Sequence, residues 1–334
     1  MKIKYSFLFA ILLFLAWPPI GFNAFIFIAF VPAFYLVDAC FQEVIIETKK
    51  KSSNALFYYC YIGFAIFNLA SSYWIWNASA VGMIIAVLLN AFLMTLPFIF
   101  YQKMRQITNP KMALLAFIAA WMSMEYFHLH WDLSWPWFSL GNAFASSSTW
   151  VQWYEYTGVF GGTLWVLTLN ALLYLALQQV EWKNKNLKVF APALLLIIIP
   201  IIISKIIYSN YTEQINPCHV VVVQPNIDPY NEKFSASNEN EQMQKLLQLS
   251  AVSAKKNTEF IIWPETALAS TIAEEQLASD PKIIQAQSFL STYKNAALIT
   301  GASTYLTYVS AQTPTARVFS NGQCCYDVFN TALL

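Results

Sequence analysis

Charged side chains are scarce in this 334-residue sequence: Asp, Glu, Lys and Arg make up 11% of it, against about 25% in an ordinary soluble protein. The net charge is only +1, and no basic cluster is interleaved with base-stacking aromatics, which argues against nucleic-acid binding. The five cysteines form no CxxC pair and no metal-ligand spacing. We therefore expect no zinc site, no disulfide framework and no cofactor.

The shortage of charge is uneven along the chain. Residues 1–210 are apolar with charges in short clusters, whereas residues 217–334 have the composition of a soluble α/β domain. A helix needs about 20 apolar residues to cross a bilayer. We therefore predict a polytopic α-helical membrane region of about seven spans, followed by an α/β domain. The candidate spans are residues 5–20, 22–41, 56–76, 79–100, 112–130, 158–180 and 189–208.

Lysine and arginine are missing from every second connection between these spans. They occur at the N-terminus and in the connections at 49–51, 103–111 and 183–188, while 17–22, 72–79 and 131–157 contain none. The positive-inside rule then places the N-terminus in the cytoplasm. After seven spans, residues 217–334 are predicted to lie on the far side of the membrane.

The long connection at 131–157 is rich in Trp and Tyr, including Trp135, and admits two interpretations. It is either an aromatic belt that anchors the protein at the interface or a platform on which lipid is handled, with Trp135 in contact with substrate. Glu125 lies inside the fifth predicted span, and an ionisable residue there is a candidate for binding substrate. The alternative is that Glu125 only pairs with a polar neighbour such as His128.

Strand-like and helix-like segments alternate after residue 217. We predict strands at 219–227, 259–265 and 296–303, helices at 236–256 and 281–295, and a hairpin over 316–334 that turns at Asn321-Gly322. This alternation favours a mainly parallel sheet, in which the chemistry gathers at the carboxyl ends of the strands. Glu265 is the last residue of the second predicted strand and is therefore expected at that edge.

Six segments spread over the chain follow one another in an order and spacing that are specific as a set. The segments are 135-WPWFSLGNAF-144, 152-QWYEYTGVFGG-162, 221-VVVQPNIDPYNEKF-234, 260-FIIWPETAL-268, 297-ALITGAS-303 and 329-FNTALL-334. Together they resemble the apolipoprotein N-acyltransferase family, whose soluble domain is of the nitrilase, or carbon–nitrogen hydrolase, type. The resemblance spans essentially the whole chain and implies a partial nitrilase-like α/β sandwich over 217–334.

The resemblance implies a Glu-Lys-Cys triad in which Glu265 is the general base. In this family a cysteine takes an acyl chain from a phospholipid as a thioester and passes it to the α-amino group of a diacylglyceryl-cysteine on a lipoprotein. A base beside a thiol supplies the thiolate that such an attack needs. The implied partners are a phospholipid donor and a lipoprotein acceptor. The implied location is a bacterial inner membrane with the catalytic domain on its periplasmic side. Phe234 lies where the family carries an aromatic near the mouth of the site, and we expect it to contact substrate.

The family's lysine and cysteine lie beyond the segment that 329–334 resembles, so we expect this chain to be a C-terminally truncated, inactive piece of the enzyme. Cys324 or Cys325 is an alternative nucleophile, although both precede the matching segment. Two other functions stay open. One is a membrane-tethered amidase or nitrilase that hydrolyses C–N bonds, and the other is a membrane scaffold that has lost catalysis.

Overall fold

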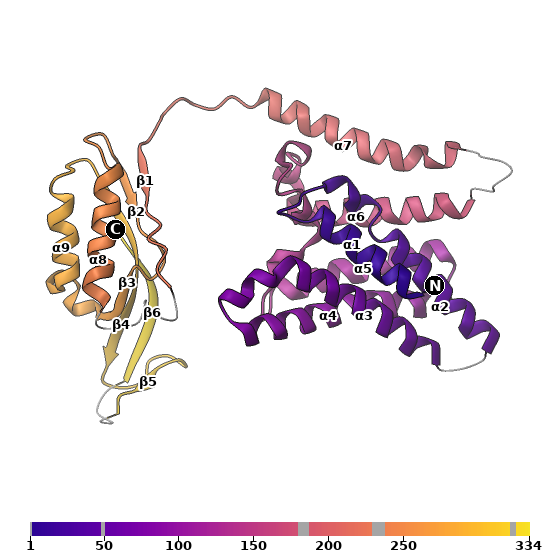
Figure 1. The fold of residues 1–334 in the computed structure, drawn as a ribbon, viewed down its shortest axis with the longest axis horizontal. Coiled ribbons are helices and arrows are strands. Elements are labelled where there is room, and N and C mark those ends of the chain that lie inside the picture. The colour runs from indigo at the N-terminus through magenta and orange to yellow at the C-terminus, as the bar shows by residue number, and fades with distance from the viewer. Residues whose placement is uncertain (1, 48–50, 180–186, 229–237, 321–324) are drawn as a thin grey trace. The chain divides into compact units, whose positions relative to one another are not determined.

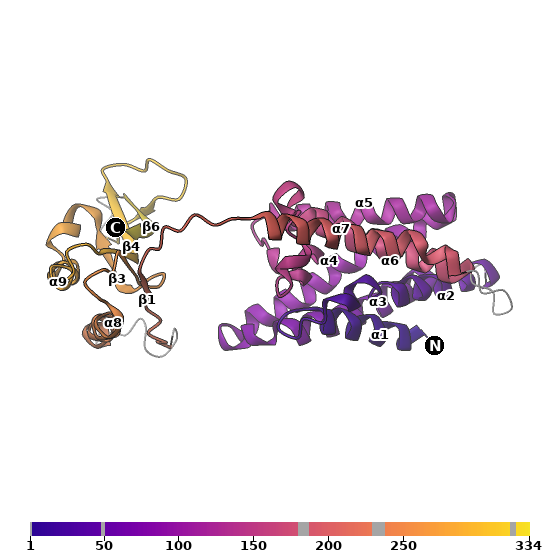
Figure 2. The ribbon, with the colours of Figure 1, turned by 90° about the horizontal axis from the view of Figure 1, so that it is seen from above.

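The computed structural model describes residues 2–47, 51–179, 187–228, 238–320 and 325–334. The chain forms two compact units, Met1–Thr212 and Glu213–Leu334 (Figures 1 and 2). Each unit is described by itself below. The first consists of helices, and the second is a sheet with helices packed on it.

The first unit is a bundle of long apolar helices joined by short 3-10 turns. Polar residues begin some of these helices: Ser79 Oγ accepts a hydrogen bond from Gly82 N at 3.0 Å, and Asn109 Oδ1 accepts one from Met112 N at 3.0 Å. The α-helices are α1 (Lys2–Ala16), α2 (Val31–Glu47), α3 (Lys51–Ser72), α4 (Ala80–Ile107), α5 (Pro110–Leu129), α6 (Tyr154–Gln179) and α7 (Ala191–Asn210). The 3-10 turns are η1 (Asn23–Phe27), η2 (Tyr73–Asn77), η3 (Pro136–Phe138), η4 (Leu140–Phe144), η5 (Ser148–Trp150) and η6 (Leu187–Phe190).

Within the described residues, six segments are long and apolar enough to cross a membrane, against the seven predicted. The difference is α1, whose 15 residues extend about 22 Å, less than the ~30 Å apolar core of a bilayer. It ends at Ala16, directly before the turn that contains Pro18 and Pro19. Figure 1 places the N-terminus at the end of the bundle where α2 ends and α3 begins.

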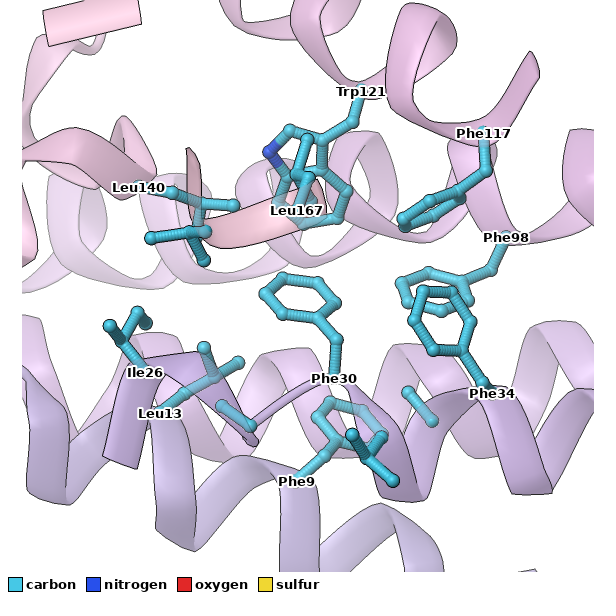
Figure 3. Packing of buried hydrophobic residues seen from close by; sticks show 14 of the residues in the cluster. Phe9, Leu13, Ile26, Phe30, Phe34, Phe98, Phe117, Trp121, Leu140 and Leu167 are labelled. Carbon is cyan, nitrogen blue, oxygen red and sulfur yellow. The ribbon is translucent and has the colours of Figure 1, made fainter. Parts of the chain in front are cut away.

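Aromatic side chains fill the centre of the bundle. Phe30 lies between Phe9 and Trp121 (Figure 3), and its ring meets the indole of Trp121 edge to face at 4.9 Å. Phe34 contacts Phe117 in the same geometry at 5.2 Å. Because lipid tails are as apolar as these side chains, association of the helices depends on close packing and on internal hydrogen bonds.

Buried asparagines satisfy the backbone where the helical path breaks between η1 and α2. Asn170 of α6 accepts a hydrogen bond from Phe30 N at 2.8 Å and donates one to Ile26 O at 2.8 Å. Backbone groups without partners are costly inside a bilayer. The side chain of Asn170 therefore makes the non-helical segment at residues 28–30 tolerable.

The second unit is a mixed sheet with two α-helices on one face (Figure 1). Val221, Ile261 and Leu298, each on a different strand, are buried in one cluster with residues of both helices. The elements are β1 (Val220–Val222), α8 (Glu239–Ser253), β2 (Phe260–Ile262), β3 (Leu268–Ala273), η8 (Glu274–Ser279), α9 (Pro281–Leu290), β4 (Ala297–Tyr308), β5 (Arg317–Val318) and β6 (Cys325–Leu333).

The strand order is β1-β2-β4-β6-β5, with β3 also paired to β4. Strands β1, β2 and β4 are parallel, as predicted, but β6 runs antiparallel to β4 and to β5. The pairing with β6 extends β4 to Tyr308, beyond the predicted end at 303, because nine residues of each strand face one another. The antiparallel β5 and β6 form the predicted hairpin, whose turn at Asn321-Gly322 lies outside the described residues.

Candidate functional site

Glu265 lies just beyond the carboxyl end of β2, at the edge of the parallel part of the sheet. The ladder continues through Trp263, whose N–H donates to Ile299 O at 2.9 Å, and the chain then leaves the sheet. The indole of Trp263 is buried and donates to Ser250 Oγ of α8 at 2.9 Å. Pro264 O accepts a hydrogen bond from Gly301 N at 3.3 Å. The two residues before Glu265 therefore anchor its backbone, Pro264 to the neighbouring strand and Trp263 to the helix layer.

A glycine on the neighbouring strand allows the turn after β2 to come close. A Cβ added to Gly301 would lie 2.7 Å from Glu265 Cα and 2.6 Å from Thr266 N, closer than real side chains come. Thr266 adopts a left-handed conformation with φ of +53°, which is uncommon for a residue other than glycine. The backbone that carries Glu265 is therefore held against β4 by a contact that only glycine permits.

The carboxylate of Glu265 has one partner within the described residues. Asn330 Nδ2 donates to Glu265 Oε1 at 2.5 Å, and Asn330 lies opposite Ser303 in the pairing of β6 with β4. Glu265 is exposed to solvent in the described part of the chain. Asn330 is a neighbour that the sequence analysis missed, because 65 residues separate it from Glu265 and no local signal joins them.

The described cysteines of the second unit do not meet Glu265. Cys325 and Asn330 are five residues apart on the uninterrupted β6, so they lie about 17 Å apart and their side chains point to opposite faces. Since Asn330 bonds Glu265, Cys325 lies far from that carboxylate. Cys218 precedes β1, at the other end of the parallel strands. Cys324 lies outside the described residues.

Lys282 is engaged elsewhere. Its ammonium pairs with Glu239 Oε2 at 2.8 Å and also donates to Ser270 Oγ. These partners lie at the start of α8 and on β3, and no bond joins Lys282 to Glu265 in the described structure. Phe234, predicted to contact substrate, lies outside the described residues.

In the first unit, Glu125 is 4% exposed and its carboxylate accepts three hydrogen bonds. Trp121 Nε1 and Leu140 N each donate to Oε1 at 2.9 Å, and Thr163 Oγ1 donates to Oε2 at 2.7 Å. Glu125 therefore joins α5, the connection 130–153 and α6. The contact with substrate predicted for Glu125 stays a prediction.

His128 does not pair with Glu125, which was the alternative left open by the sequence. Its Nε2 is 2.5 Å from Asn90 Oδ1, and Trp131 Nε1 donates to its Nδ1 at 3.0 Å. An indole N–H can only donate, so Nδ1 is the acceptor in this contact. Among the described residues, no group of three His, Cys, Asp or Glu has the arrangement of a metal site.

Trp135 lines a cavity of about 640 Å³ at one end of the bundle. We call this cavity the aromatic cleft and define it by Trp17, Ser71, Trp74, Trp135, Trp137 and Phe138. Its walls come from the turn after α1, the end of α3 with η2, and the connection that contains η3. These are connections without Lys or Arg, so the cleft lies at the end of the bundle opposite the basic clusters.

Helices long enough to span a bilayer, followed by an α/β domain with a carboxylate at a strand end, define a multi-pass membrane protein with a candidate catalytic domain. Residues 9–172 match the family model described as the apolipoprotein N-acyltransferase N-terminal domain. An apolipoprotein N-acyltransferase from Chlorobaculum tepidum is 28% identical over 255 residues, covering 75% of this chain and 46% of that protein. The membrane region of this chain is therefore similar to the N-terminal domain of apolipoprotein N-acyltransferases, and the chain spans less than half the length of this relative.

Proposed function

We propose that this chain carries the membrane region and the glutamate-bearing part of an enzyme that transfers a fatty acyl chain from a phospholipid to a lipoprotein. The acceptor is the N-terminal α-amino group of a diacylglyceryl-cysteine. One observation carries the proposal: Glu265 lies at the carboxyl edge of a parallel sheet, in a chain whose membrane region matches this family. Ligands and catalytic groups of α/β sheets gather at that edge.

The proposed chemistry has two steps. A cysteine thiol gives its proton to the carboxylate of Glu265, and the thiolate attacks an ester carbonyl of the phospholipid. The C–O bond breaks, and the lysophospholipid leaves with the proton as a thioester forms. The amine of the acceptor then attacks the thioester, an amide forms, the C–S bond breaks, and the proton that the amine loses returns to the cysteine as a thiol. Neither described cysteine of the second unit is close enough to Glu265 to be this nucleophile.

The orientation that we propose follows from the basic residues. Lys103, Arg105 and Lys111 flank the connection between α4 and α5, whereas the connections around η2 and η3 lack Lys and Arg. By the positive-inside rule, the connection between α4 and α5 lies in the cytoplasm of a bacterium, and the three helices α5, α6 and α7 follow it before the second unit. The second unit then lies on the periplasmic side of the inner membrane, where Glu265 can reach lipids of the outer leaflet.

The test is a labelling assay in vesicles with a phospholipid that carries a radioactive acyl chain. Label on the protein that hydroxylamine removes reports the thioester. The samples are the 334-residue chain and the chain extended by whatever codons follow Leu334 in the same reading frame. We expect label only on the extended protein, lost in Glu265→Gln and kept in Glu259→Gln. Glu259 is the matched control because it directly precedes the same strand, at the end opposite Glu265.

Two outcomes would contradict parts of the proposal. Label that survives Glu265→Gln would remove Glu265 from the role of general base. Label on the 334-residue chain that disappears in Cys324→Ser would place the nucleophile within this chain, and the second unit would then catalyse acylation without further residues. Release of ammonia from soluble amides, with no label from lipid, would favour the amidase.

A further inference from the structure

We propose that the aromatic cleft of the first unit binds one ester-linked acyl chain of an outer-leaflet phospholipid. This inference rests on the proposed function, because it assigns a waiting site to the acyl donor. The cleft, at about 640 Å³, lies within the range of about 300–1,000 Å³ that is typical of small-molecule sites.

The lining of the cleft selects an uncharged ligand group. The residues around it are aromatic, proline, serine, asparagine or alanine, and none of the described residues that line it carries a charge. A phosphate would have no cationic partner there, and burying it unpaired would be costly. The headgroup therefore stays in water, and the apolar part of the lipid enters.

The aromatic side chains that line the cleft range from exposed at its mouth to buried at its floor. Trp74 and Trp137 are 48% and 57% exposed and meet edge to face at 6.0 Å. Further in, Trp17 and Phe138 are 6% and 8% exposed and meet edge to face at 5.5 Å. Exposed tryptophans are typical of the membrane–water interface. The outer pair thus forms a mouth at headgroup level, and the inner pair forms an apolar floor.

Two lining residues carry polar atoms without partners in the described structure. Ser71 Oγ and Trp135 Nε1 are buried and make no hydrogen bond. Both groups can donate, and an unpaired buried donor costs about 1–3 kcal/mol. An ester carbonyl is an uncharged acceptor that can pair with such a donor. This is why we assign the ester, together with its chain, to the cleft.

A phospholipid is the occupant that mass action favours. The cleft lies at the end of helices that cross the bilayer, where phospholipid is present in large excess over any lipoprotein. The acceptor lipoprotein also carries ester-linked chains, so it would occupy the cleft only by displacing phospholipid. The test below therefore includes an acceptor competitor as an outcome that overturns the assignment.

The experiment is photolabelling of the 334-residue chain in phosphatidylcholine nanodiscs. They contain about one diester phosphatidylethanolamine per hundred lipids, with a diazirine on one acyl chain. Labelled peptides are counted by mass spectrometry. We expect peptides of the cleft to carry at least three times the label of α7, a helix that is largely uncovered and reports ordinary lipid contact. Equal labelling of the two regions would overturn the proposal.

Variants identify the cleft itself. Trp74→Ala and Trp137→Ala are expected to lower the label at least threefold, whereas Trp76→Ala is expected to leave it unchanged. Trp76 is the matched control because it is 57% exposed on η2 but does not line the cleft. Ala145→Trp fills the exposed rim without removing any packing, so it tests the proposal even if the alanine variants fail to fold. Label kept in Ala145→Trp would overturn the assignment.

Two further comparisons are needed. The first separates binding of the ester group from binding of the acyl chain, and the second separates binding in the cleft from catalysis at Glu265. A diether analogue is expected to label at least threefold less than the diester, and Trp135→Phe is expected to remove that difference. Equal labelling by both lipids would overturn the role of the ester. Loss of label with a synthetic diacylglyceryl-cysteine peptide at equal concentration would assign the cleft to the acceptor. Glu265→Gln is expected to leave photolabelling unchanged, so failure of acyl transfer and failure of the cleft give different results.

Discussion

Replacing Gly301 with alanine should displace the backbone that carries Glu265. The new Cβ would lie 2.6 Å from Thr266 N, whereas ordinary contact begins at roughly 3.5 Å, so the turn must move by close to 1 Å. The atoms in the way belong to the backbone on both sides, and neither can rotate out of the contact. Overpacking of this kind costs about 1–3 kcal/mol, which corresponds to about a 5- to 150-fold change in an opening equilibrium.

The assay for Gly301→Ala is hydrogen exchange of the full chain in nanodiscs, followed by mass spectrometry. We expect peptides over 260–268 and 297–308 to exchange about 5- to 150-fold faster, while peptides of the membrane helices stay unchanged. Ser303→Ala is the control, because it lies two residues along the same strand and introduces no clash. Exchange in Gly301→Ala equal to that of Ser303→Ala would refute the argument that only glycine fits.

Three other predictions follow from particular bonds. Glu125→Ala removes the acceptor of three buried donors and should cost about 3–5 kcal/mol. Glu125→Gln keeps one acceptor oxygen and should lower the stability less than Glu125→Ala does. Equal thermal unfolding temperatures of both variants and the wild type in detergent would disprove this. Ser250→Ala leaves the buried indole N–H of Trp263 unpaired, which should destabilise the folded domain by about 1–3 kcal/mol. We therefore expect faster hydrogen exchange of peptides over 260–268. Local desolvation, with the hydrogen bond and charge of Glu259, raises the pKa of the exposed Cys218 thiol. Glu259→Gln should lower that pKa and speed maleimide labelling of the Cys218 peptide near pH 8; an unchanged pH profile would contradict it.

The membrane helices were largely predictable because a run of apolar residues is a local property of the chain. The exception was α1, where the apolar run continues to Ile20 but the helix ends at Ala16. Pro18 and Pro19 follow, and proline in a helix interior removes a hydrogen bond and clashes with the preceding turn. The sequence contained this signal, and the apolar composition outweighed it in the prediction.

Strand β3 was missed because 268-LASTIA-273 contains small and polar residues and no strong alternation. It forms by pairing with β4, which the chain reaches only about 25 residues later. The edge position of Glu265 was predictable from the strand that precedes it. Gly301 could have been suspected, since glycine inside a strand often marks a close approach of another backbone.

The sequence by itself determined which segments are apolar enough for a bilayer, which connections carry positive charge, and that Glu265 follows a strand. Each of these depends on neighbours in the chain, which is why local patterns reveal them. The tertiary structure alone decided which partners meet: Asn330 with Glu265, Thr163 and Leu140 with Glu125, and three separate connections around the aromatic cleft. Those contacts join residues that are distant in the sequence. Strand register and helix packing bring these residues together, and both exist only in the folded chain.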